Sequence, residues 1–181
     1  MAITATDLLF KLSVKTGAAG NSMAGTPADS LGKYISTTQL SGTALNNLFD
    51  DVTGDENAAS DVEYRCIFVH NAHGSLTLVG TKVWLSAETA GGASIAVAID
   101  DIAASVVGSA GAQADEIADE GTAPGAGVGA FSSPTSKGTG LTLGDIAAGQ
   151  CRAIWVKRTA ANTAALDNDG VTIAIEGDTA A

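Results

Sequence analysis

Apolar and polar side chains alternate along several stretches of the chain, and this period of two predicts strands in a sheet. The clearest stretches cover residues 8–14, 62–70 and 151–158. In the second, Val62, Tyr64, Cys66 and Phe68 fall on one face, and Glu63, Arg65, Ile67 and Val69 fall on the other. In the third, the two faces hold Arg152, Ile154, Val156 and Arg158 and, opposite them, Cys151, Ala153, Trp155 and Lys157.

Further strands are expected at residues 76–85, 93–99, 141–146 and 171–176. Turns rich in glycine, asparagine and aspartate separate these stretches. The count of about seven to nine strands predicts an all-β protein, a single antiparallel β-sandwich of the immunoglobulin-like or jelly-roll kind. We expect the strands at 62–70 and 76–85 to pair as a hairpin or meander.

The first 42 residues are expected to form a strand followed by an extended N-terminal arm, because residues 17–32 are rich in glycine, alanine and serine. Such an arm suits pairing with a neighbouring subunit. The alternative is that residues 8–14 form the first strand of the same sandwich, followed by a long loop. The sandwich domain itself is expected over residues 43–181.

A short helix is expected at residues 43–52, where apolar side chains have helical spacing. These side chains are Leu45, Leu48, Phe49 and Val52. Thr43 is placed to cap the start. Asp50 and Asp51 oppose the dipole at the other end, so the helix should be short.

Residues 100–140 are dense in glycine and alanine and carry an acidic cluster. The cluster consists of Asp115, Glu116, Asp119 and Glu120. Because a structureless loop of this length is unusual in a compact domain, we expect one or two short strands within it. The apolar residues that mark them are Val106, Val107, Ile117, Val128 and Phe131. The remainder is expected to be mobile or ordered by a partner.

The chain of 181 residues has 20 acidic and 9 basic side chains, and its net charge is −11. This charge argues against a nucleic-acid partner, which needs cations to neutralise phosphates, and against an anionic membrane surface. The sequence has no apolar run of about 18 residues that could span a membrane. Asp7 and Lys11 interrupt the stretch where a signal peptide would be apolar, so we expect synthesis in the cytoplasm without an export signal.

Aromatic residues make up only 4% of the chain, so the core is expected to consist of valine, isoleucine, leucine and alanine with a few large anchors. These anchors are Phe10, Phe49, Phe68, Trp84, Phe131 and Trp155.

Two acidic stretches were considered as calcium sites. The carboxylates within residues 50–61 match no known cation loop, which favours a solvated acidic loop. Residues 167–170 followed by Glu176 resemble an EF-hand loop, but its first ligand position falls on Ala165, which has no side-chain oxygen. A hairpin turn explains these residues better.

The remaining candidates for chemistry are two histidines and two cysteines. His70 and His73 could share a metal, but no third ligand is evident. Cys66 and Cys151 are expected to be buried free thiols, with one bridge between two sheets as the alternative. Because the sequence shows no nucleophile elbow, phosphate loop or histidine–acid pair, we expect no catalytic, cofactor or metal site and no enzyme. A carboxylate pair acting on a glycan is the one enzymatic alternative left open.

Three stretches resemble a group of small structural proteins of tailed phages. The first is Ser36-Thr37-Thr38 with LNNLFDDV at residues 45–52. The second is VEYRC at residues 62–66, with NAH at 71–73 and KVW at 82–84. The third is AGQ at residues 148–150 with IWVKR at 154–158. The resemblance covers about half of the chain and implies a virion protein without a catalytic site.

Among virion roles, the size, the all-β class, the acidic surface and the arm favour a capsid decoration or cement protein that stabilises the assembled head. Its expected partners are the major capsid protein or other virion proteins, and it is expected to form a homo-oligomer on the particle. One alternative is a subunit associated with the tail, baseplate or fibre. Another is a glycan-binding module of a receptor-binding apparatus, which would need exposed aromatic platforms, whereas Trp84 and Trp155 are expected in the core.

Overall fold

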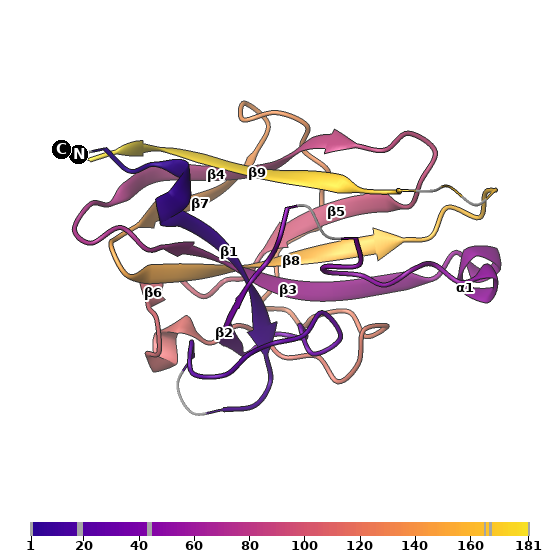
Figure 1. Cartoon of the computed structure of the whole chain (residues 1–181), viewed down its shortest axis with the longest axis horizontal. Coiled ribbons are helices and arrows are strands. Elements are labelled where there is room, and N and C mark those ends of the chain that lie inside the picture. Colours follow the sequence, from indigo (N-terminus) through magenta and orange to yellow (C-terminus); the bar gives the residue numbers. More distant parts are fainter. Residues whose placement is uncertain (1, 18–19, 43–44, 165, 167, 181) are drawn as a thin grey trace.

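Two antiparallel sheets packed against each other form the protein, which confirms the all-β sandwich (Figure 1). The computed structural model describes residues 2–17, 20–42, 45–164, 166 and 168–180. The strands are β1 (Leu8–Val14), β2 (Tyr34–Gln39), β3 (Val62–Asn71), β4 (Leu78–Glu88), β5 (Ser94–Ile99), β6 (Ser105–Val106), β7 (Leu141–Ile146), β8 (Gln150–Thr159) and β9 (Val171–Thr179). The helices are α1 (Gly54–Ala59) and the 3₁₀ turns η1 (Ala5–Asp7) and η2 (Ala110–Ala112).

The six-stranded sheet has the order β2-β1-β3-β8-β5, with β6 pairing to β8, and the three-stranded sheet has the order β7-β4-β9. Strands that follow one another in the chain therefore often lie in different sheets. The predicted hairpin of 62–70 with 76–85 is wrong, because β3 and β4 belong to different sheets. The predicted hairpin turn at 167–170, of which Asp167 lies outside the described residues, is also wrong, because this segment links β8 to β9 across the sandwich.

The predicted faces of β3 and β8 are confirmed, and both faces are buried. One face packs against the three-stranded sheet, in a core that contains Ile67, Val69, Val83, Leu85, Leu143, Ile154 and Val156. The opposite face forms a second core, which contains Leu31, Cys66, Phe68, Ala112, Ile117, Cys151, Ala153 and Trp155. The six-stranded sheet is thus the middle layer of three.

The outer layer consists of two Gly- and Ala-rich segments, residues 20–33 and 103–131, and we call it the covering layer. The segments bond to each other, since the N–H of Ile117 donates to the carbonyl of Leu31 (3.1 Å) and that of Ala114 to Lys33 (2.9 Å). A Cβ on Gly32 would lie 1.8 Å from the Asp115 carbonyl oxygen, so only glycine permits this approach.

Within residues 100–140, one predicted short strand is present as β6, and Val128 makes a single bridge to Asp100. The prediction that the remainder is mobile or ordered by a partner is wrong where residues 112–117 pack on the sheet, with Ala112 and Ile117 buried.

The first strand lies inside the sheet. β1 pairs with β3 on one side and with β2 on the other. Ser30 then anchors the returning segment, because its hydroxyl accepts the Ser13 N–H (2.9 Å) and donates to the Cys66 carbonyl (2.7 Å). Of the two alternatives for residues 1–42, the described residues show a first strand of the same sandwich, followed by a loop packed on it.

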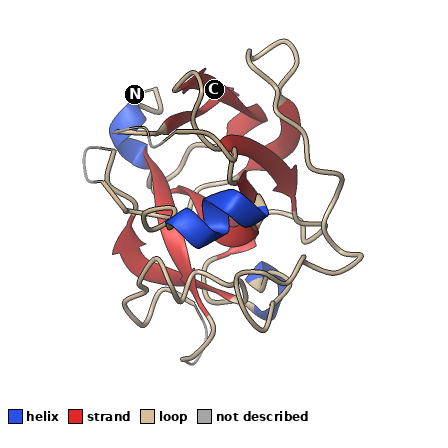
Figure 2. Cartoon of the chain, turned by 90° about the vertical axis from the view of Figure 1, so that its right-hand side faces the viewer, coloured by secondary structure: helices blue, strands red, loops and turns tan. Residues whose placement is uncertain are grey.

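The predicted helix at 43–52 is wrong over its described part, since residues 45–49 form turns and bends and residues 50–53 have no regular secondary structure. Thr43 lies outside the described residues. Asn46 has a φ of 56°, which interrupts a right-handed helix, and Leu45 is 70% exposed. The helix α1 begins later, after a capping box in which the Glu56 N–H donates to Thr53 Oγ1 and the Thr53 N–H donates to the Glu56 carboxylate. Figure 2 looks onto this end of the molecule, with α1 in front.

The two tryptophans lie in different environments. Trp155 is fully buried, as expected of a core anchor. The expectation for Trp84 is wrong, because it lies between the inward-facing Val83 and Leu85 and is partly exposed on the outer face of the three-stranded sheet.

Buried Asp100 joins the second core to the covering layer. Its carboxylate accepts hydrogen bonds from Trp155 Nε1 (3.0 Å), from the Asp115 N–H (3.0 Å) and from the Ile102 N–H (3.2 Å). One side chain therefore satisfies polar groups of the sheet and of the layer that covers it.

We expect Asp100→Ala to lower the free energy of unfolding by about 3 kcal/mol, because it leaves buried N–H donors without an acceptor. Urea unfolding at neutral pH measures this loss. Asp101→Ala is the matched control: it removes the neighbouring, exposed carboxylate and should change stability by less than about 0.5 kcal/mol. Equal effects of the two substitutions would contradict the role assigned to Asp100.

Candidate interaction cleft

Three of the acidic residues before β3 have separate structural roles. Glu56 completes the cap of α1, Asp61 Oδ1 accepts the Val62 N–H (2.8 Å), and Asp50 pairs with Arg158.

Across the described ranges, no group of three or more histidine, cysteine, aspartate or glutamate side chains is arranged to hold a metal ion. No helix in the described part of the chain is long and apolar enough to cross a membrane.

The residues that resembled an EF-hand loop also lie apart. Asp169 Oδ2 accepts the Ala93 N–H (2.6 Å), and Glu176 on β9 pairs with Lys137 (2.6 Å). Ala165 and Asp167 lie outside the described residues. Asp169 therefore holds the loop before β5, and Glu176 joins β9 to the segment before β7.

The histidines have different surroundings. His73 Nδ1 accepts the N–H groups of Ser75 (3.1 Å) and Leu76 (3.0 Å) and so shapes the turn after β3. His70 is half-buried in β3, and its pKa is lowered by burial and by the nearby charge of Lys11. Both placements agree with a structural use.

Both cysteines are free and buried on the same face of the six-stranded sheet, so the alternative of a bridge between two sheets is wrong. Burial raises the pKa of Cys151 to about 12, and it also raises the pKa of Cys66. These thiols are therefore protonated at neutral pH and poor nucleophiles.

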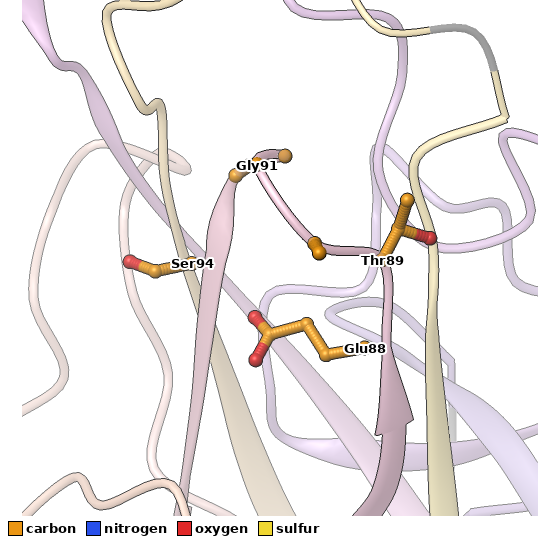
Figure 3. Close-up of a pocket in the computed structure, with 7 residues that line it drawn as sticks. Glu88, Thr89, Gly91 and Ser94 are labelled. Atoms are coloured by element: carbon orange, nitrogen blue, oxygen red, sulfur yellow. The ribbon is translucent and has the colours of Figure 1, made fainter.

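A small depression of about 230 Å³ lies in the turn between β4 and β5 (Figure 3). Glu88 is the one carboxylate that lines it, and its Oε1 accepts the Ile95 N–H (2.8 Å). This bond closes the turn, and the Asp169 carboxylate next to the depression is already bound to the Ala93 N–H (2.6 Å).

A larger, open cleft has a volume of about 980 Å³. Its lining includes residues 45–54, which we call the wall segment, and the start of β9 with the residues before it. Half-buried apolar side chains also line it: Phe10, Leu40, Phe49, Val171 and Ile173. Leu45 and Leu166, which are 70% and 44% exposed, belong to the same lining. The cleft therefore offers apolar contact area to a ligand.

A group of ion pairs fixes the wall segment. Arg158, 7% exposed, pairs with the buried Glu63 on the adjacent strand, and its Nε lies 2.6 Å from Glu63 Oε2. The same guanidinium donates to the backbone carbonyl and to the carboxylate of Asp50 (Nη2–Oδ1 3.2 Å). It also lies over the ring of Phe49, with Cζ 4.8 Å from the ring centroid. The strand pair β3–β8 thus positions the wall of the cleft.

The rim of the cleft is acidic. Arg158 is committed to Glu63 and Asp50, and Asp51 is exposed and forms no hydrogen bond or ion pair with a residue in the described part of the chain. Asp169 lines the same cleft. An apolar interior with carboxylates at its edge suits a ligand that is apolar and cationic.

No local pattern in the sequence predicts this cleft. The signals that the sequence contains are Glu63 and Arg158, two charged residues on strand faces that also carry core side chains, and the apolar residues of 45–52, whose spacing predicts a helix instead. Comparison of the chain with protein-family models, curated proteins and solved structures finds no match.

We expect Arg158→Met to lower the free energy of unfolding by about 3 kcal/mol at pH 7, because it leaves Glu63 buried without its cation. Burial already raises the pKa of Glu63, and Arg158 opposes that rise. Without Arg158, the pKa of Glu63 in the folded protein lies further above its pKa in the unfolded chain. The folded protein therefore loses stability as the pH rises through the folded-state pKa of Glu63. The deficit should therefore be smaller at pH 4 than at pH 7.

Urea unfolding at both pH values measures this difference. Lys157→Met, on the opposite face of the same strand, is the matched control and should cost less than about 1 kcal/mol at either pH. In Arg158→Met combined with Glu63→Gln, the added dependence on pH should disappear. A deficit of the same size at pH 4 and pH 7 would show that the charge of Glu63 is not its cause.

Proposed function

We propose that this chain is a structural virion protein, a capsid decoration or cement protein that binds and stabilises the assembled head of a tailed phage. The resemblance of three stretches to small phage structural proteins is the observation that carries the proposal. In the structure parts of these stretches lie close together: residues 45–52 belong to the wall segment, and residues 62–66 and 154–158 lie in the paired strands β3 and β8, from which Arg158 binds Asp50 of that segment. Residues 36–38, 71–73, 82–84 and 148–150 do not line the cleft.

Stabilisation would follow from mass action. A protein that binds the assembled lattice and not its free subunits stabilises the lattice, by about 2.7 kcal/mol per site at a free concentration one hundred times Kd. Contacts repeated by the symmetry of a head would add up over the particle. The major capsid protein is the proposed partner, and the chain would act as a homo-oligomer on the head, without nucleic acid or membrane as partners.

Expanded heads of the encoding phage, prepared without this protein, provide the test. Adding the purified chain should produce saturable binding and raise the temperature at which the heads release DNA. Absence of binding to expanded heads would overturn the proposal. In electron micrographs of labelled particles, signal over the whole head supports it, and signal at one vertex or on the tail supports a tail, baseplate or fibre subunit instead.

Glycan binding is a second candidate, favoured by the position of Trp84. Its partly exposed ring lies on the outer strand face beside Ala174, its cross-strand neighbour. An indole on an open face can stack on the apolar side of a sugar ring.

On a glycan array, Trp84→Ala should abolish wild-type binding and Trp84→Phe should retain part of it. Because Trp84 is outside both cores, both variants should keep the wild-type circular dichroism spectrum. Absence of wild-type binding, or unchanged binding by Trp84→Ala, would remove this candidate.

A further inference from the structure

Two of the four sheet edges, at β2 and β5, are covered by backbone hydrogen bonds from other parts of the chain. Along β2, the Asn21 N–H donates to the Ile35 carbonyl, and the Thr37 N–H donates to the Met23 carbonyl (2.8 Å). This edge is therefore closed by the segment that precedes β2.

The edge at β5 is closed as well. Val97 and Ser132 exchange backbone hydrogen bonds of 2.8 and 3.0 Å, and the Gly129 N–H donates to the Ile99 carbonyl (2.9 Å). On β7, the Leu143 carbonyl accepts a side-chain hydrogen bond from the guanidinium of Arg152, which occupies one position of that edge. Such coverage is how proteins protect the unpaired backbone groups of an edge strand.

The fourth edge, at β9, lacks this coverage. Among the described residues β9 pairs with β4 alone, and residues 171–178 form no backbone hydrogen bond on the other side. Its sequence, VTIAIEGDT, contains neither proline nor lysine, which commonly protect edges. Val171, Thr172 and Ile173 of this strand line the cleft, so the free edge borders the apolar interior.

We infer that β9 is a docking strand that captures one extended segment of a partner polypeptide, apolar on one face and bearing lysine or arginine. The segment would pair with the main chain of β9 and direct alternate side chains into the cleft, towards Phe10, Leu40 and Ile173. This inference deepens the proposed function and rests on it for the idea of a protein partner.

The negative charge around the cleft favours a cationic segment over a second copy of the chain. Asp51 and Asp169 line the cleft, Asp178 lies further along β9, and the whole chain carries a net charge of −11. A second copy of the chain would bring the same acidic groups to the edge and would be repelled. A cationic segment would be attracted to the same groups.

The shape of the cleft favours a single strand. The wall segment and the start of β9 line the same cleft, so a partner that pairs with β9 there must fit beside the wall segment, and one extended chain needs less room than the edge of a second folded sheet. The exposed Leu45 and Leu166 line this cleft and would be covered by the captured segment. Each would then bury surface that water now contacts.

Fluorescence anisotropy with synthetic peptides tests the inference. The probe is a labelled ten-residue peptide in which valine and isoleucine alternate with lysine and threonine. The full chain should bind it, and binding should weaken with salt and disappear when glutamate replaces lysine. Methylation of the backbone nitrogens along one edge of the peptide should abolish binding, and methylation along its other edge should preserve it.

Leu45→Ser combined with Leu166→Ser should weaken peptide binding about tenfold or more. Met23→Ser combined with Val106→Ser is the matched control, because these apolar side chains, 44% and 58% exposed, do not line the cleft. The control variant should bind like the wild type. No binding by the wild type, or equal loss in both variants, would overturn the docking strand.

Sedimentation of the wild type should show no dimer that depends on Leu45 and Leu166. Such a dimer would identify a second copy as the occupant and overturn the inference.

The head-binding and peptide-binding experiments test the proposed function and the docking strand independently. Peptide binding without head binding contradicts the proposed function alone, and head binding without peptide binding contradicts the docking strand alone.

Discussion

The pairing of β3 with β8 is the constraint on which the rest of the structure depends. Both strands carry large apolar side chains on both faces, so the sheet they centre must be covered on both sides. The three-stranded sheet covers one face. No second sheet is present on the other face in the described ranges, and the Gly- and Ala-rich covering layer packs there, because small residues let its backbone approach the strands closely.

The same strand pair links the fold to its candidate site. Beyond the apolar centre, the facing positions change to Glu63 and Arg158, and this pair holds Phe49 and Asp50 of the wall segment. A buried ion pair is a weak source of stability compared with apolar packing. Here the ion pair mainly fixes the position of the wall segment, which has no regular secondary structure and lies beside an open cleft.

Alternation along the chain was enough to predict the faces of β3 and β8, because the period of two decides which side chains share a face. It carried no information on which strands pair, and the sheet membership of β4 and β9 was therefore missed. Applied to Trp84, the same rule predicts an outward-facing side chain, because its neighbours Val83 and Leu85 both face inward.

The prediction of a helix at 43–52 is wrong for a local reason, because Asn46 takes a left-handed conformation although the apolar spacing is helical. The cleft depends on distant segments meeting, and no local pattern predicts that.

The order of the strands also has a consequence for synthesis. Residues 62–70 pair with residues 151–159, so β3 leaves the ribosome long before its partner on β8 exists. During this interval a strand with two apolar faces is exposed to other nascent chains. The strong negative charge of the chain opposes their association, and folding is completed only when the last third of the protein has been made.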